Sequence, residues 1–208
     1  MTQPTQAPDV AEVLKRNYGV LYRHAAGRLA LIALLIVASY GLHALGTPDP
    51  VLVPFFVVAA FVFLFAVIRL SNGLRMGVSK RVLNTYPLEY HTRVDKKSSQ
   101  WLLLGDVHTV KVSVRGRHGA PRMRAVNASA VRRWPKGAET GGAWVAGDLA
   151  FGAVMVVPGT LDLLFMQPEN WDKFAAERAQ ADPERLARAE RSGITKRLER
   201  EPKVSYGT

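Results

Sequence analysis

The sequence predicts a membrane-embedded α-helical hairpin of two transmembrane helices, joined to a small antiparallel β sheet or barrel with C-terminal helices. Three observations predict this α+β layout. Two stretches without a charged residue, 29–48 and 50–68, are each long enough to cross a hydrocarbon core of about 30 Å at about 1.5 Å per residue. Apolar and polar residues then alternate in several short runs between 88 and 166, which is strand spacing. A segment rich in charges of both signs follows.

The first segment, residues 1–28, combines a polar tail with a predicted amphipathic juxtamembrane helix. Asp9 and Glu12 have the spacing of an N-terminal capping box, with Asp in the place of Ser or Thr. Charged residues continue to Arg28, so we do not expect a cleavable signal peptide. The helix either lies along the inner leaflet or extends the first span into the cytoplasm, and the sequence leaves both placements open. Its apolar residues recur at three- and four-residue steps: Val10, Leu14, Tyr18, Leu21 and Ala25.

The hairpin, residues 29–70, has both ends on the same side of the predicted membrane. The link around Asp49 is too short for any arrangement other than an antiparallel pair. Neither stretch keeps the polar stripe that a soluble helix usually has. The link carries no Lys or Arg, whereas four precede the hairpin and four follow it. The positive-inside rule therefore predicts a multi-pass protein of a bacterial cell membrane with both termini in the cytoplasm.

A basic connector, residues 71–86, is expected to continue the second span as a helix and to end before Pro87, which disfavours helical geometry in the residue before it. We expect its cations to lie near anionic lipid headgroups, where each gains about 1 kcal/mol. The three residues assigned to this headgroup contact are Arg75, Lys80 and Arg81.

The β module, residues 87–167, is predicted from runs that alternate with a period of two. Val110, Val112 and Val114 point to one face, and the residues between them point to the other. The turn at 158–160 joins two apolar runs, which predicts a hairpin. About five short strands would give an SH3-like barrel, an OB-like barrel or an open sheet, and the sequence does not choose among them.

Basic residues are concentrated between 69 and 140. This region holds 15 Lys and Arg against 4 Asp and Glu, which equals the net charge of +11 of the whole chain. Anionic lipid, an acidic protein surface and nucleic acid are candidate partners of this basic region. The fourth possibility is a solvated face that has no partner. Nucleic acid is disfavoured because only Tyr90 and Trp134 are at hand for base stacking. The residues assigned to this basic face are Lys111, Arg115, Arg117, Arg122 and Arg124.

The last segment, residues 168–208, is expected to form charged helices. Trp171 and Phe174 suit a helix that packs on the sheet. Asp182 and Pro183 have the residue types of an N-cap and a first helical position. A second helix over Glu184–Glu201 is expected to be solvated, because it carries charges of both signs throughout.

Chemical motifs are sparse, and we expect neither a cofactor nor a metal. The chain has no cysteine, and its five histidines are scattered. Phosphate-binding glycine loops and the G-x-S-x-G nucleophile turn do not occur. Asp148 and Asp162 could form a carboxylate pair across the last hairpin, although Asp is also favoured at such turns for backbone hydrogen bonding. The sequence therefore predicts a protein that is not an enzyme.

The run AWVAGDLAFGAVMVVPG, followed by a hydrophobic strand and QPENW, resembles uncharacterised two-span membrane proteins of high-GC Gram-positive bacteria with a C-terminal cytoplasmic β module. The resemblance implies a bacterial inner-membrane location and no particular activity. We expect a non-enzymatic membrane protein whose basic module and helical tail recruit or scaffold a protein partner at the inner face. The alternative is an accessory subunit of a transport or secretion complex that its spans contact. Small residues such as Gly41 and Ala59 leave homo-oligomer formation open.

Overall fold

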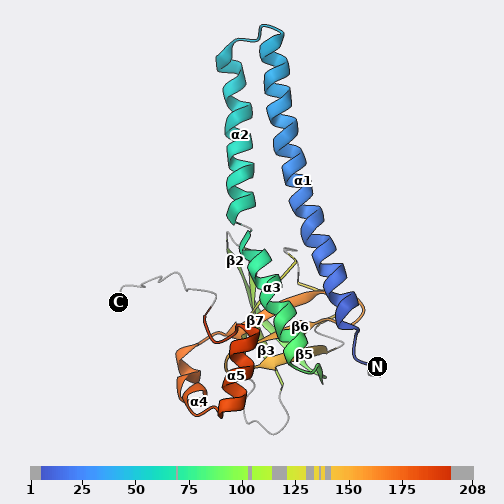
Figure 1. Ribbon diagram of the computed structural model, residues 1–208, viewed down its shortest axis with the longest axis vertical. Coiled ribbons are helices and arrows are strands. Elements are labelled where there is room, and N and C mark those ends of the chain that lie inside the picture. Colours follow the sequence, from blue (N-terminus) through green and yellow to red (C-terminus); the bar gives the residue numbers. More distant parts are fainter. Residues whose placement is uncertain are drawn as a thin grey trace.

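A long helical pair projects from a curled β sheet with shorter helices packed around it (Figure 1). This arrangement is seen in a computed structural model. The structure describes residues 6–68, 70–102, 105–113, 121–129, 134–135, 137–138 and 142–197.

The first helix, α1 (Val10–Ala44), runs without a break through 35 residues. Asp9 caps it, because its carboxylate accepts a hydrogen bond from the amide of Ala11 at 3.0 Å. The lower part of α1 packs against the sheet, whereas its upper part pairs with α2 (Asp49–Ile68) (Figure 1). The amphipathic segment is thus the start of the first long helix. Four residues of its apolar stripe, Val10, Leu14, Tyr18 and Leu21, pack against the core of the sheet, whereas Ala25 is exposed. This packing favours the extension of the first span over a placement along the inner leaflet.

The upper part of the helical pair leaves most of its apolar surface uncovered. Leu34 is 64% exposed and Phe61 is 58% exposed. Burial is confined to small or aliphatic residues where the two helices meet: Ser39, Leu52 and Ala59. Both α1 and α2 are long and apolar enough to cross a membrane, as the sequence predicts.

The connector forms α3 (Leu70–Thr85), which ends before Pro87 as predicted. One side of α3 is apolar and fully buried, with Met76 and Val82 in the same core cluster as Val13 of α1. Helices α1 and α3 therefore both contribute residues to the core of the sheet domain.

The β module is a single curled antiparallel sheet of seven strands, not about five, in the order β1-β5-β6-β7-β4-β3-β2. The predicted hairpin of β6 and β7 is confirmed, with Val154 opposite Phe165. The strands are β1 (Glu89–His91), β2 (Val94–Leu102), β3 (Gly105–Val112), β4 (Arg122–Asn127), β5 (Ala143–Asp148), β6 (Gly152–Val156) and β7 (Leu163–Pro168).

The curl follows from the two edge strands, because β1 and β2 are neighbours in sequence but lie at opposite edges of the sheet. The alternating run from Leu88 to Asp95 is divided between two strands, because the extended backbone breaks at Thr92 and Arg93. Its first part pairs with β5 and its second part pairs with β3. One bent segment thus supplies both edges, and the sheet must curl into a half-barrel to allow it.

Two apolar clusters cover the two faces of this sheet. The inner cluster contains Val110, Met123 and Met155, and it fills the curl. The outer cluster contains Val154 and Phe165, and it packs against α1, α3 and α5. All residues of β6 and β7 are consequently buried, which explains their nearly continuous apolar sequence.

The C-terminal helices are shorter than expected and are packed rather than solvated. A 3₁₀ turn (Asp172–Phe174) precedes α4 (Ala175–Ala179) and α5 (Pro183–Ser192). Asp182 caps α5 as predicted, because its carboxylate accepts from the amide of Arg185 at 2.8 Å. The helix ends at Gly193 with a φ of 76°, so the prediction of a helix over Glu184–Glu201 is wrong. Ala189 and Ile194 are fully buried, which anchors this segment to the outer cluster.

Candidate functional site

The three cations assigned to lipid headgroups do not form one patch. Arg75 is only 6% exposed, and its side chain has an interaction inside the structure. Lys80 and Arg81 are exposed on α3. The Nε of Arg81 also donates to the carbonyl of Ser192 at the end of α5, at 3.4 Å. Of the three residues, Arg75 is therefore misassigned to the surface, because α3 turns that side toward the protein.

The strand register brings the described residues of the predicted basic face together, but acidic residues lie beside them. Lys111 lies opposite Arg122, and Arg124 follows two residues later on the same face of β4. Asp95 lies opposite Lys111 at the edge of the sheet. Arg115 and Arg117 lie outside the described residues.

An acidic residue also borders this face. The hydroxyl of Thr109 donates to Glu169 at 3.4 Å. At the sheet edge, Arg93 donates to Asp95 at 3.0 Å, and this hydrogen bond lowers the pKa of the Asp95 carboxyl. Four described cations (Arg93, Lys111, Arg122 and Arg124) thus share the face and its rim with two carboxylates, so the face is not uniformly cationic.

Asn17 fixes α1 to the sheet, and sequence analysis did not single it out. Its Nδ2 group donates to the carbonyls of Val13 and Leu161, each at 2.8 Å. Its Oδ1 atom accepts from the amide of Leu163 at 3.2 Å. Asn17 is 1% exposed, so a single side chain satisfies backbone groups of both α1 and the β6–β7 connection.

This clamp also holds an unusual backbone conformation. Leu161 has a φ of 52°, the left-handed region that costs a residue with a side chain about 1 kcal/mol or more. A polar residue within the apolar stripe of α1 was the available sequence signal: Asn17 lies between Leu14 and Leu21 at helical spacing. Buried amides in such stripes usually have specific partners.

A polar cleft of about 480 Å³ lies between the end of α3, strands β1 and β5, and helix α5. Four carboxylates and two guanidinium groups line it, together with Tyr86 and His91. Burial raises the pKa of the Tyr86 phenol, and the negative charge of Asp148 raises it further. The lining carboxylates and guanidinium groups are Glu89, Asp148, Asp182, Glu184, Arg185 and Arg188.

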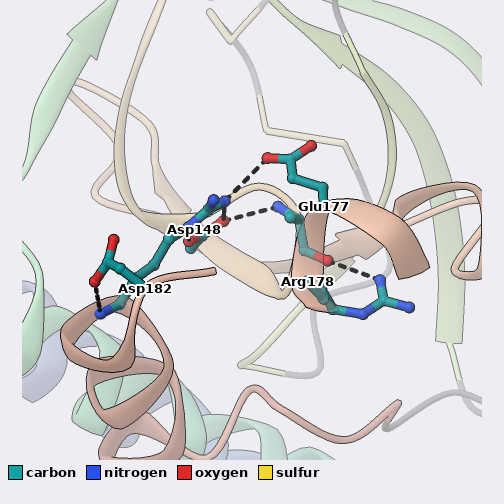
Figure 2. A network of polar contacts seen from close by, with 6 residues as sticks. Asp148, Glu177, Arg178 and Asp182 are labelled. Carbon is teal, nitrogen blue, oxygen red and sulfur yellow. Dashed lines mark hydrogen bonds and ion pairs between the residues drawn. The ribbon is translucent and has the colours of Figure 1, made fainter. Parts of the chain in front are cut away.

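Asp148, which lines this cleft, belongs to the polar network drawn in Figure 2. Arg185 makes a bidentate contact with Asp148, with Nη2 2.8 Å from Oδ1 and Nε bonded to Oδ2. The same Nη2 group donates to Glu177 at 2.9 Å. The two carboxylates hold the pKa of Arg185 above its ordinary value, chiefly through the hydrogen bond to Asp148. The network therefore joins α4 and α5 to the β5–β6 turn.

Arg178 adds a second tie between α4 and the sheet. Its guanidinium donates to the carbonyl of Ala150 at 3.0 Å and to that of Trp171 at 2.8 Å. The group also lies 4.0 Å from the centroid of the Trp171 ring, which is a cation–π contact. Burial lowers the pKa of Arg178.

The carboxylate pair considered from sequence is not formed. Asp148 lies opposite Gly152 at one end of β6. Asp162 lies beyond the other end of β6, in the turn where its carbonyl accepts from Val157. The full length of β6 separates the two carboxylates, and Asp148 is occupied by Arg185.

A Ser–His pair lies on the inner side of the β2–β3 ladder. Ser99 Oγ and His108 Nδ1 are 2.8 Å apart, and the Trp134 ring packs edge-on against the imidazole with centroids 5.0 Å apart. Burial lowers the pKa of His108, and the charge of Lys96 lowers it further, so the neutral imidazole is favoured. Among the described residues, no carboxylate hydrogen-bonds to His108, so the orienting member of a catalytic triad is missing there.

The described residues include no group of three or more side chains suited to holding a metal ion. The chain matches no protein-family model, no curated protein and no solved structure. The resemblance to two-span proteins of high-GC Gram-positive bacteria thus stays a prediction, and the function has to be argued from the geometry.

Proposed function

We propose that this protein is a two-span integral membrane protein whose β module is a non-enzymatic docking platform held rigidly at the inner membrane face. The observation that carries the proposal is the continuity of α1. One unbroken helix is buried against the sheet at Val13 and Asn17 and presents bare apolar side chains to its surroundings from Leu29 onward. A lipid bilayer is the surrounding that such a surface fits.

The dimensions support this proposal. The 20 residues of α2 rise about 30 Å, the thickness of a hydrocarbon core. The exposed apolar band continues around both helices, with Val37 68% and Val51 53% exposed. The cations that flank the pair, and their absence from the Gly46–Pro50 link, favour an orientation with both termini in the cytoplasm.

Headgroup contact is assigned to cations that are exposed near the lower ends of the two spans. Arg23 on α1 meets this condition, because it lies six residues, or about 9 Å along the helix, before Leu29. It would gain about 1 kcal/mol at an anionic surface, within a Debye length of about 8 Å. Lys80 and Arg81 on α3 are also exposed, but they lie about 18 Å of helix or more beyond Ile68 and would reach the headgroups only through their long side chains. Arg75 is replaced in this role by Arg23, because its side chain is buried.

Partner recruitment is assigned to the face that carries Lys111, Arg122 and Arg124. The test is a triple charge reversal to Glu in the full-length protein, followed by crosslinking in native membranes and mass spectrometry. We expect the reversal to remove the main crosslinked protein while the protein stays in the membrane fraction. An unchanged crosslinking pattern would contradict the docking role of this face.

A second candidate function is that of an accessory subunit whose spans contact a larger transport or secretion complex. Gly41 favours it, because a Cβ added there would meet no atom within 4 Å, so this small surface is open to another helix. Ala59 lies instead where α1 and α2 meet. Gly41→Leu should then release the complex and leave the fold intact, whereas the basic-face reversal should have no effect on assembly.

A further inference from the structure

One edge of the curled sheet is a long strand with a neighbour on one side. Strand β2 has nine residues and stands last in the strand order, and in the part of the chain that the structure describes it pairs with β3 alone. The strand at the other edge, β1, has three residues. Native sheets usually keep unpaired edges short, because the free N–H and C=O groups of an edge pair readily with another chain. The length of β2 is therefore unusual for an edge.

The first part of β2 is open to solvent. Lys97, Ser98 and Ser99 are three consecutive exposed residues, although consecutive side chains of a strand point to opposite faces. In an antiparallel pair, the backbone groups of alternate residues bond to the neighbouring strand, and those of the residues between them point away from it. Among the described elements, only β3 packs extensively against β2. The outward N–H and C=O groups of β2 are therefore available to an added strand.

The charges on this edge favour an acidic chain over a second copy of this protein. Asp95 is the one acidic residue of β2, and it accepts a hydrogen bond from Arg93. The ammonium group of Lys96 lies 5.7 Å from the centroid of the Trp134 ring, whereas Lys97 is exposed. Two copies of β2 side by side would bring the lysines of both copies together, and like charges across a strand pair destabilise it.

A bulge adds selectivity to the edge. The register of β2 against β3 shifts between Lys96 and Ser98. Bulges and lysines on edge strands oppose indiscriminate pairing with other sheets. They do not oppose a strand of complementary charge, because the exposed lysine then gains a partner. The edge is consequently selective for its partner and is not closed to pairing.

We propose that β2 receives an added strand from the protein partner, and that this strand is an extended segment rich in Asp and Glu. The inference rests on the proposed docking function, because the segment would lie beside the face that carries Lys111, Arg122 and Arg124. Lys111 is one strand inward from the edge, opposite Asp95. Neighbouring strands are about 4.8 Å apart, so the backbone of an added strand would lie about 10 Å from that of β3, within reach of two long side chains.

The test uses the absence of native cysteine and a short synthetic peptide in which Glu alternates with Val. In the full-length protein in detergent, Ser98→Cys places one exposed thiol on β2, opposite Thr109. Peptides with a single Cys at successive positions are then compared in disulfide formation. Because the side chains of a strand alternate between faces, we expect efficient disulfides at every second peptide position. Asn84→Cys, at an exposed position of α3, is the control and should show no alternation.

The charge preference is tested with the same peptide carrying a fluorophore. Lys97→Glu should weaken binding about tenfold, because it replaces an attraction by a repulsion. Lys15→Glu makes the same change of net charge at an exposed position of α1 and should leave the affinity within about twofold. A peptide in which Lys replaces Glu should not bind measurably. Equal weakening by the two substitutions, or equal affinity of the two peptides, would overturn the assignment of an acidic segment.

The outcomes separate this inference from the proposed function. Disulfides of Ser98→Cys that show no alternation, or no disulfides at all, would overturn the added strand. If the triple reversal of Lys111, Arg122 and Arg124 still removes the main crosslinked protein, the docking function would stand without the added strand. A disulfide-linked dimer as the main product of Ser98→Cys would assign the edge to a second copy and would also overturn the inference. Failure of both tests would overturn both proposals.

Discussion

The two halves of α1 belong to the same helix but have different surroundings. In the lower half, Val13 is fully buried and Asn17 is 1% exposed. In the upper half, Leu34 is 64% and Val37 is 68% exposed, although the residues are at least as apolar. An apolar sequence therefore does not by itself determine whether a helix is buried within the protein. The β module covers the lower half, and the upper half requires a second apolar medium, for which we propose the lipid bilayer.

The continuity of α1 also has a mechanical consequence. A flexible linker between a membrane anchor and a soluble module would let the module turn freely. Here α1 and α3 both contribute to the outer core cluster, through Val13 and Met76. The orientation of the module is therefore set by the helical pair, and a face of the module keeps a constant angle to the two long helices.

The largest effect is expected from charges placed on the bare half of the helical pair. Phe61→Lys with Leu64→Lys puts two cations near the middle of α2, at a cost of about 5–7 kcal/mol in a bilayer. We expect the variant to fail membrane integration, measured as protein left in the pellet after alkaline extraction. The control carries Lys at Tyr22 and Leu186, which are exposed outside the two spans. Equal retention of both variants would mean that α2 does not face lipid.

On the covered half, Asn17→Ala should loosen α1 from the sheet. The change leaves the carbonyl of Leu161 and the amide of Leu163 without their partner, at a cost of about 2–4 kcal/mol. Hydrogen exchange should rise at the β6–β7 connection and in the first turns of α1. Asn84→Ala, at an exposed position of α3, is the matched control. Unchanged protection in Asn17→Ala would show that apolar packing alone holds α1.

A smaller loss is expected where the C-terminal helices meet the sheet. Arg185→Met leaves Asp148, whose side chain is 10% exposed, without its bidentate partner. The expected cost is about 2–3 kcal/mol. Limited proteolysis should then cut within α4 and α5 before any other element. Arg191→Met, at an exposed site in the last turn of α5, should keep the original resistance, and equal cleavage of both variants would contradict the role of the ion pair.

Acidification should weaken the inner side of the module through His108. Its pKa in the folded protein is lowered by burial, so the unfolded chain binds the proton first. The free energy of unfolding should therefore fall as the pH drops below about 6.5, the ordinary value for histidine, until the folded form also takes up the proton. His108→Gln should flatten this dependence, and His24→Gln, at an exposed position, should not. Identical pH profiles for both variants would contradict the account.

The smallest effect is expected for the exposed ion pair on α5. Arg188 Nη2 is 2.5 Å from Glu184 Oε1, and the side chain of Glu184 is 79% exposed. Because water screens such a pair, Arg188→Ala should change the free energy of unfolding by no more than about 0.5 kcal/mol. A loss as large as that of Arg185→Met would show that the whole cleft acts as one network.

The elements that depend on residues close together in the sequence were predicted correctly. The charge-free stretches predicted α1 and α2, Pro87 predicted the end of α3, and the turn at 158–160 predicted the β6–β7 hairpin. Strand β2 was missed because the polar run from Lys96 to Gln100 has no alternation, and its pairing with β3 supplies what the sequence lacks.

The polar contacts were harder to predict, because each joins residues far apart in the sequence. Asn17 meets Leu161 and Leu163 only after the sheet has formed. The expected solvated helix over 184–201 was wrong for the same reason: Ala189 packs on the outer cluster, and Gly193 ends the helix. Composition predicted a cationic region, but only tertiary packing decided that Arg75 would be buried.

The most direct test of the central claim is alkaline carbonate extraction of membranes from cells that produce the full-length protein. The account predicts that the protein stays in the membrane pellet and is released only by detergent. Recovery of the protein in the carbonate supernatant would contradict the account, because the bare surface of α1 and α2 would then have to be covered by protein.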